Sequence, residues 1–206
     1  MLRSVGRTFF SLVSEQEGPL PDAPYVIAAN HYSHFDPPAI AAALDRPIRF
    51  LALEDLFVAS RLLEWLITGF GAISTPRFRR PITALRTALA ALDSGGVVGV
   101  FPEATRVSHW RTLPAKRGAA WLAARAGVPL VPIAMIGTGR ALGLENRVRR
   151  ARIRVIVGRP IEPGSADEMT ERWANWMDTQ IARFPGSEVD GLPRSEYDPG
   201  RPPVLG

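Results

Sequence analysis

Residues 25–44 read YVIAANHYSHFDPPAIAAAL, and this stretch decides how the chain is expected to fold. Its first five residues are apolar, uncharged and β-compatible, which predicts a buried strand over residues 25–29. Pro37 and Pro38 then open a helical pattern over residues 39–44, because proline is favoured in the first turn of a helix. A buried strand that leads directly into a helix is the repeating unit of an α/β sheet.

Outward from this unit, apolar runs alternate with helical patterns along most of the chain. We expect further strands over residues 48–53, 72–74, 97–101, 130–136 and 152–157, and helices over residues 56–70, 81–92, 116–126 and 165–183. A length of 206 residues suits one domain. The pattern predicts a single three-layer α/β domain, with a mainly parallel mixed sheet and helices on both faces.

The two ends of the chain differ from this domain, which we assign to residues 25–184. Within residues 1–24, the first thirteen combine apolar side chains with Arg3 and Arg7, which suits a basic helix on a membrane surface or a helix packed on the domain. A polar loop is expected over residues 14–22. Residues 185–206 are rich in proline, glycine and serine, which predicts a loosely ordered tail.

The helical pattern over residues 56–70 is apolar around most of its circumference. It is too short to span a bilayer, so we expect this helix to be either deeply buried in the protein or partly buried in lipid. If it is buried in the protein, its function would be to line a groove for an acyl chain.

Composition and charge narrow the classes of partner and location. The chain has no cysteine, which excludes disulfides and thiol nucleophiles. Its net charge is +5, with 24 arginines and a single lysine. Dense basic segments at residues 77–80 and 147–154 favour binding to an anionic membrane surface. Nucleic-acid binding is not expected, because the basic segments lack the interleaved aromatic residues of a single-strand binder and no helix-turn-helix or zinc-finger pattern is found. Without a spanning segment or a cleavable signal, we expect a peripheral protein on the cytoplasmic face of the membrane.

His31 and Asp36 are the candidate catalytic pair. They follow the strand over residues 25–29, and ligands bind at the carboxyl ends of strands in open α/β sheets. A carboxylate can accept a hydrogen bond from one imidazole nitrogen and leave the other as a base. The alternatives are a structural histidine beside a helix-capping Asp36, or a metal site that also uses His34.

Three charged residues follow the ends of other expected strands. Arg77 comes after residues 72–74, and Glu103 and Arg106 come after residues 97–101. If the sheet is parallel, these side chains could converge with His31 on one cleft. Arginine suits a phosphate and a carboxylate can accept from a hydroxyl, although each arginine alone could be an ordinary surface charge.

Four ordered blocks together resemble the glycerolipid acyltransferases, specifically the 1-acylglycerol-3-phosphate acyltransferase type. The first, Asn-His-x-Ser-x-x-Asp, lies at residues 30–36, and the second, Gly-x5-Arg, lies at residues 71–77. The third is Phe-Pro-Glu-Ala-Thr-Arg at residues 101–106, and the fourth is Val-Pro-Ile at residues 131–133. An ordered set of four blocks is far more specific than any one of them.

This resemblance implies a glycerolphosphate acyltransferase-like fold and an O-acyl transfer to a lysophospholipid. His31 would act as general base and Asp36 as its orienter, with acyl-CoA or acyl carrier protein as the donor substrate and no cofactor. The residues that the resemblance assigns to the acceptor are Arg77, Glu103, Thr105 and Arg106. Arg77 and Arg106 would hold its phosphate, and Glu103 its glycerol hydroxyl. Lys116, at the start of an expected helix, is either a further cation for the acceptor or an ordinary surface lysine.

The third block departs from the family pattern at two positions. Ala104 stands where glycine is usual, which argues against a positive φ angle or a close backbone approach to the acceptor at that turn, and Val107 replaces the serine after the arginine. The acceptor could therefore be another lipid or glycolipid.

Two rival functions remain open on the sequence. Ser33 could be the nucleophile of a hydrolase, although the Gly-x-Ser-x-Gly elbow is missing. A non-catalytic module that binds anionic lipid would explain the arginines but would leave His31 and Asp36 without a role.

Overall fold

The computed structural model describes residues 11–53, 71–75, 82–142 and 149–186. Among these residues, seven strands form one sheet in the order β1-β7-β6-β2-β5-β3-β4. The strands are β1 (Ser11–Gln16), β2 (Tyr25–Ala29), β3 (Arg49–Leu53), β4 (Ile73–Thr75), β5 (Val97–Val100), β6 (Leu130–Ile136) and β7 (Arg152–Val157). Only the pairing of β6 with β7 is antiparallel, so the mainly parallel mixed sheet is confirmed.

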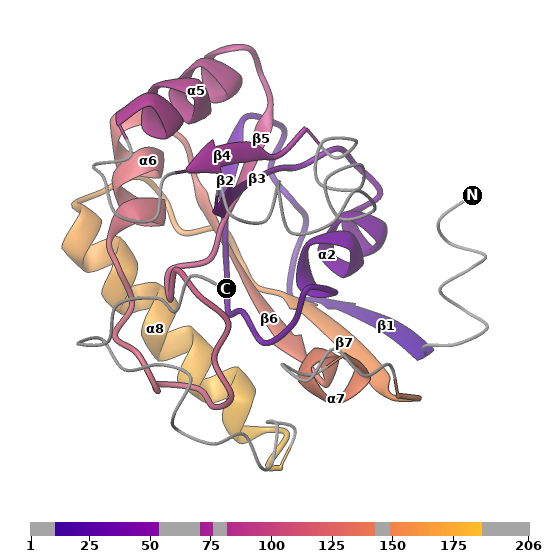
Figure 1. Ribbon diagram of the computed structural model, residues 1–206. Coiled ribbons are helices and arrows are strands. Elements are labelled where there is room, and N and C mark those ends of the chain that lie inside the picture. Colours follow the sequence, from indigo (N-terminus) through magenta and orange to yellow (C-terminus); the bar gives the residue numbers. More distant parts are fainter. Residues whose placement is uncertain (1–10, 54–70, 76–81, 143–148, 187–206) are drawn as a thin grey trace, which may run out of the picture.

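Helices cover both faces of the sheet, as expected for three layers (Figure 1). One face carries α5 (Ile82–Asp93), α6 (Gly118–Ala126) and α8 (Ala166–Ala182) over one apolar core. The other face carries α2 (Asp36–Leu44) and the short α7 (Thr138–Ala141) over a second core. The expected α/β class and its two covered faces are therefore confirmed.

The strand β2 is central, and this position explains its unbroken apolar sequence. It pairs with β5 on one side and β6 on the other, and all five of its residues are buried. Val26 and Ala28 face the core under α6 and α8, while Ile27 faces the α2 side. The indole of Trp173 in α8 donates to Ala28 O at 2.9 Å, which ties the longest helix to this strand.

The parallel strands set the position of the site. β2, β3, β4, β5 and β6 all run in one direction, so the residues that follow each of them lie along the same edge of the sheet. The first and third sequence blocks follow β2 and β5, which are adjacent strands. The fold therefore brings these two blocks together.

The start of the chain differs from the expectation. Residues 11–16 form β1, which pairs in parallel with β7 at the edge of the sheet, so the predictions of a helix through residue 13 and a loop from residue 14 are wrong there. The sheet begins at β1 and not at residue 25. A strand at a sheet edge has one unpaired side. Half of the β1 residues are exposed and only Leu12 and Val13 are apolar, so β1 lacks the apolar run that marks a buried strand.

Some expectations fall outside the described residues. These are the apolar helix over 56–70, residues 1–10 of the N-terminal segment and residues 187–206 of the tail. In the parts of the chain that are described, no helix has the length and apolar character needed to cross a bilayer.

Candidate active site

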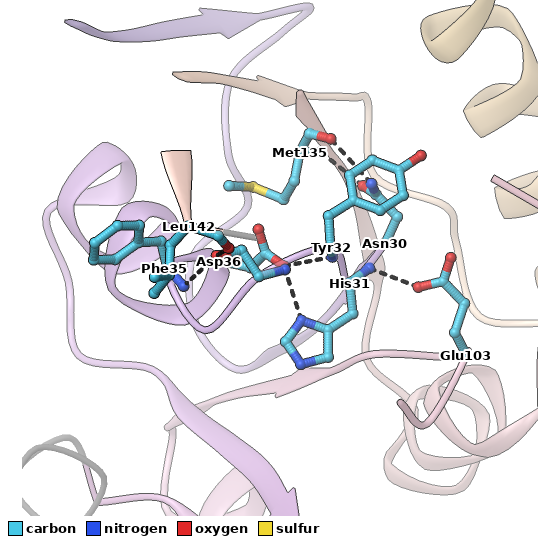
Figure 2. A network of polar contacts seen from close by, with 9 residues as sticks. Asn30, His31, Tyr32, Phe35, Asp36, Glu103, Met135 and Leu142 are labelled. Carbon is cyan, nitrogen blue, oxygen red and sulfur yellow. Dashed lines mark hydrogen bonds and ion pairs between the residues drawn. The ribbon is translucent and has the colours of Figure 1, made fainter. Parts of the chain in front are cut away.

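Asn30 fixes the point where the chain leaves β2. Its Nδ2 donates to Met135 O at 3.0 Å, and its Oδ1 accepts from Met135 N at 2.7 Å, so a fully buried side chain clips the end of β2 to β6 (Figure 2). Buried amides that satisfy both donor and acceptor give strong positional constraint. The following residue, His31, therefore starts from a fixed backbone position.

The His31 and Asp36 side chains are in direct contact. The His31 Nδ1 lies 2.8 Å from Asp36 Oδ2, and the same oxygen accepts from Tyr32 N and Ser33 N at 2.7 Å each (Figure 2). Asp36 is fully buried, whereas the His31 side chain is 14% exposed. With Nδ1 donating to the carboxylate, Nε2 is the ring nitrogen that can accept a proton from outside.

The turn between these residues is held by Ser33. Its hydroxyl donates to Leu142 O at 2.7 Å and accepts from Phe35 N at 3.1 Å, and Ser33 itself is fully buried. The Pro37 and Pro38 pair lies at the start of α2, as the sequence predicts. A hydroxyl that is buried and occupied in this way is poorly suited to nucleophilic attack, which argues against the Ser33 hydrolase.

The loop after β5 makes hydrogen bonds with the backbone of His31. Glu103 Oε2 accepts from His31 N at 2.6 Å, and Val107 N donates to His31 O at 2.8 Å. The ring of Phe101 stacks on the imidazole with 4.0 Å between centroids and 15° between planes. Residues 101–107 thus contact His31 on its N–H, its carbonyl and its ring.

Glu103 lies in a different environment from the one the sequence suggests. It is only 2% exposed, and its Oε1 is buried with no hydrogen-bond partner among the described residues. Burial raises the pKa of Glu103 to about 8. The hydrogen bond from His31 N lowers this pKa, and the negative charge of Asp36 raises it further. The structure therefore gives Glu103 a backbone partner, and its contact with an acceptor hydroxyl stays a prediction.

This environment predicts a pH dependence of stability. The ordinary pKa is 4.5, so between pH 4.5 and about 8 the folded chain keeps a proton on Glu103 that the unfolded chain releases. The free energy of unfolding should therefore fall as pH rises through this window, by at most about 1.4 kcal/mol per pH unit. Glu103→Gln should flatten the fall in urea unfolding measured from pH 5 to 8. An equal fall in both proteins would contradict the assignment.

Arg106 lies close to the histidines of the first block. Burial lowers the pKa of His34 to about 4, and the charge of Arg106 contributes next, followed by His31. His34 is therefore neutral at physiological pH, and with so low a pKa it is too weak a proton acceptor to suit a second base. The structure brings His31, Asp36, Glu103 and Arg106 to one edge of the sheet.

Ala104 has a positive φ angle, although alanine in place of glycine argues against one. Its φ is 58°, in the left-handed region that glycine tolerates best, and its side chain is exposed. We expect Ala104→Gly to stabilise the fold by up to about 1 kcal/mol, because relief of roughly 1–2 kcal/mol of backbone strain exceeds the added unfolded-state entropy. Chemical denaturation measures this difference, and a less stable glycine variant would contradict it.

The other expected site residues have different outcomes. Arg77 lies outside the described residues, and Thr105 is half-buried beside Arg106. Lys116 is exposed, and its backbone N–H donates to Pro102 O at 2.8 Å. Within the described residues, no hydrogen bond or ion pair joins Lys116 to His31, Asp36 or Glu103.

A metal site also lacks support in this geometry. Within residues 11–53, 71–75, 82–142 and 149–186, no group of three or more His, Asp or Glu side chains could hold a metal ion. His31 Nδ1 instead contacts Asp36 Oδ2 at 2.8 Å.

Sequence reasoning gave no role to two contributors. Asn30 and Phe101 both belong to the sequence blocks, but the sequence assigns a contact to neither. The position of Asn30 directly after a buried strand is a usable signal, since a buried amide there needs partners on a neighbouring strand. The stacking of Phe101 has no comparable signal in the sequence.

One known family covers the part of the chain that carries this site. The acyltransferase family model matches residues 12–136, which is more than half of the chain. The chain belongs to this acyltransferase family.

Several curated relatives of this acyltransferase are named as 1-acyl-sn-glycerol-3-phosphate acyltransferases. A chloroplastic 1-acyl-sn-glycerol-3-phosphate acyltransferase of Brassica napus is 31% identical over 161 residues, covering 76% of this chain and 46% of that protein. The 1-acyl-sn-glycerol-3-phosphate acyltransferase of Bacillus subtilis is 28% identical over 141 residues, covering 68% of each chain. This acyltransferase spans less than half the length of the plant and algal relatives it matches.

A solved structure has the same fold. The crystal structure of the 1-acyl-sn-glycerophosphate acyltransferase PlsC from Thermotoga maritima superposes on this acyltransferase with a TM-score of 0.73. The superposition covers 89% of this chain and 76% of that chain, at 24% sequence identity. The expected acyltransferase-like α/β fold is confirmed.

Proposed function

We propose that this acyltransferase moves a fatty acyl group from a thioester donor to the free hydroxyl of 1-acylglycerol-3-phosphate. The observation that carries the proposal is the contact of His31 Nδ1 with the buried Asp36 carboxylate, at the carboxyl edge of the strands and beside Arg106. The curated relatives are named as 1-acyl-sn-glycerol-3-phosphate acyltransferases, which supports the same reaction. Acyl-CoA and acyl carrier protein are the two candidate donors, and no cofactor is needed.

The reaction requires one proton to be moved and returned. His31 Nε2 takes the proton of the acceptor hydroxyl while that oxygen bonds to the thioester carbonyl carbon. The carbon–sulfur bond then breaks, and the leaving thiolate receives the proton from the imidazolium. Asp36 keeps the imidazole in the required tautomer and stabilises its charged form, as in other His–carboxylate pairs. No covalent acyl-enzyme is needed.

The acceptor phosphate is assigned to arginine. Arg106 lies beside His34 in the same cluster as His31, and a guanidinium can bind a phosphate through two parallel hydrogen bonds. Arg77, Thr105 and Lys116 complete the proposed acceptor contacts, with Glu103 near the glycerol hydroxyl. The proposed setting is an anionic membrane surface on its cytoplasmic side, where the excess of arginine favours peripheral binding.

The role of the phosphate can be tested with two acceptors. Rates are measured with 1-acylglycerol-3-phosphate and with 1-acylglycerol, which lacks the phosphate, using palmitoyl-CoA and palmitoyl carrier protein in turn. Arg106→Ala should raise the KM for the phosphate-bearing acceptor about tenfold and should leave the phosphate-free acceptor unaffected. Arg125→Ala, an exposed arginine on α6, is the matched control and should behave as wild type.

The outcomes separate the remaining alternatives. Equal rates with both acceptors would show that the phosphate is not recognised and would favour another lipid or glycolipid acceptor. Vesicle binding without transfer from either donor would contradict the enzyme and favour a lipid-binding module.

A further inference from the structure

Three aromatic rings form a continuous stack that ends at His31. The Phe101 ring lies 4.0 Å from the imidazole, and the Phe50 ring lies 5.4 Å from Phe101, with 12° between their planes. Phe50 is 5% exposed and Phe101 is 9% exposed, so both rings are held by the core on the α2 side of the sheet. Phe50 belongs to β3 and lies outside all four sequence blocks.

Gly99 provides the space that Phe50 occupies. Phe50 pairs with Gly99 in the register of β3 and β5, and residues 99 and 101 point to the same face of the sheet. A Cβ atom at position 99 would lie 2.3 Å from Phe50 Cε1 and 2.4 Å from Cδ1, closer than real atoms approach. Any side chain at position 99 would therefore push the Phe50 ring away from its place beside Phe101.

The stack supplies a constraint that Asp36 does not. The carboxylate fixes the position of Nδ1, but the imidazole can still rotate about that contact, and the flat Phe101 ring sets its plane. When His31 takes a proton, the imidazolium lies over the face of Phe101, and the negative face of an aromatic ring attracts a cation.

We propose that Gly99, Phe50 and Phe101 form an aromatic support that holds the plane of the His31 ring and stabilises its imidazolium form. Phe50 and Gly99 are positioning residues, since they reach His31 only through Phe101. The proposal rests on the acyl transfer described above, but the placement of the ring can be measured without turnover.

The kinetic test uses conservative changes and a double variant. Phe50→Leu removes the ring but keeps an apolar side chain, and we expect about a tenfold lower kcat with a KM for the acceptor within about twofold of wild type. Gly99→Ala should lower kcat similarly. Leucine at position 50 lacks the Cε1 atom that lies 2.3 Å from the added methyl group, and it can turn its Cδ atoms away from position 99. The double variant should therefore be no slower than Phe50→Leu alone, which is the non-additivity expected of residues in contact.

The matched control is Ile153→Ala. Ile153 is a 3% exposed residue of β7 in the same core, and three strands separate β7 from β3. Its truncation lowers stability without touching the stack, so kcat should stay at the wild-type value. A kcat that falls as far in this control as in Phe50→Leu would overturn the proposal.

The second readout is the proton spectrum of the imidazole rings. The chain has three histidines, and loss of a signal in His31→Ala assigns His31. The ring current of Phe101 should shift the His31 ring protons upfield in wild type, and Phe50→Leu should move them back while Ile153→Ala should not. Unmoved His31 signals or an unchanged kcat in Phe50→Leu would overturn the proposal. A wild-type protein inactive with every donor would refute the proposed function, and the spectra would still decide the support.

Discussion

Replacing His31 by alanine is expected to lower kcat about 10³-fold while the protein stays folded. General-base catalysis by a positioned side chain contributes roughly 10²–10⁴-fold, and no other side chain described in contact with Asp36 can take its place. The KM for the acceptor should change little, since the proposed phosphate contacts lie on arginines. Initial rates of lipid product formation measure this effect.

The fold should survive this substitution because the backbone of residue 31 makes its contacts without the side chain. The bonds from His31 N to Glu103 and from Val107 N to His31 O remain available to alanine. Circular dichroism and thermal unfolding serve as the control. A variant that is folded and keeps more than a tenth of the wild-type kcat would rule out His31 as the base.

Replacing Asp36 by alanine is expected to reduce both activity and stability. The Asp36 Oδ2 accepts from His31 Nδ1 and from the backbone N–H groups of Tyr32 and Ser33. Each buried donor that loses its acceptor costs about 1–3 kcal/mol, so we expect a loss of roughly 2–4 kcal/mol in the free energy of unfolding. Since the imidazole loses its orienter, kcat should fall at least about 10²-fold.

Asp36→Asn separates the two roles. Its carbonyl oxygen can still accept from both backbone N–H groups, so most of the stability should return, but an amide does not stabilise an imidazolium as a carboxylate does. We therefore expect the amide variant to be nearly as stable as wild type and still impaired at least about 10²-fold. Urea unfolding and steady-state kinetics on the same preparations provide the measurement. Full activity in this variant would contradict the role given to the Asp36 charge.

The sequence predicted the centre of the sheet better than its edge. β2, β6 and β7 have the predicted bounds, because strands inside a covered sheet are marked by apolar runs between turn residues. β1 was missed because half of its residues face solvent and its pairing with β7 joins residues about 140 positions apart. Local patterns carry no information about such a partner.

The contact between His31 and Asp36 was predictable because it is local in the sequence. His31 and Asp36 are separated by one turn, so the spacing alone suggests their contact, and the structure confirms that contact. The hydrogen bonds that Glu103 and Val107 make with the His31 backbone were not predictable, because they depend on β2 and β5 being neighbours. The position of the Phe50 ring over Gly99 depends in the same way on the register between β3 and β5.

Transfer of an acyl group to 1-acylglycerol-3-phosphate with His31 as the base is tested most directly by following free thiol and diacyl product together in one reaction. Wild type and His31→Ala are measured side by side. We expect one thiol released for each diacyl product in wild type, and the loss of both in the variant. Thiol release without diacyl product, or undiminished product from the variant, would contradict this expectation.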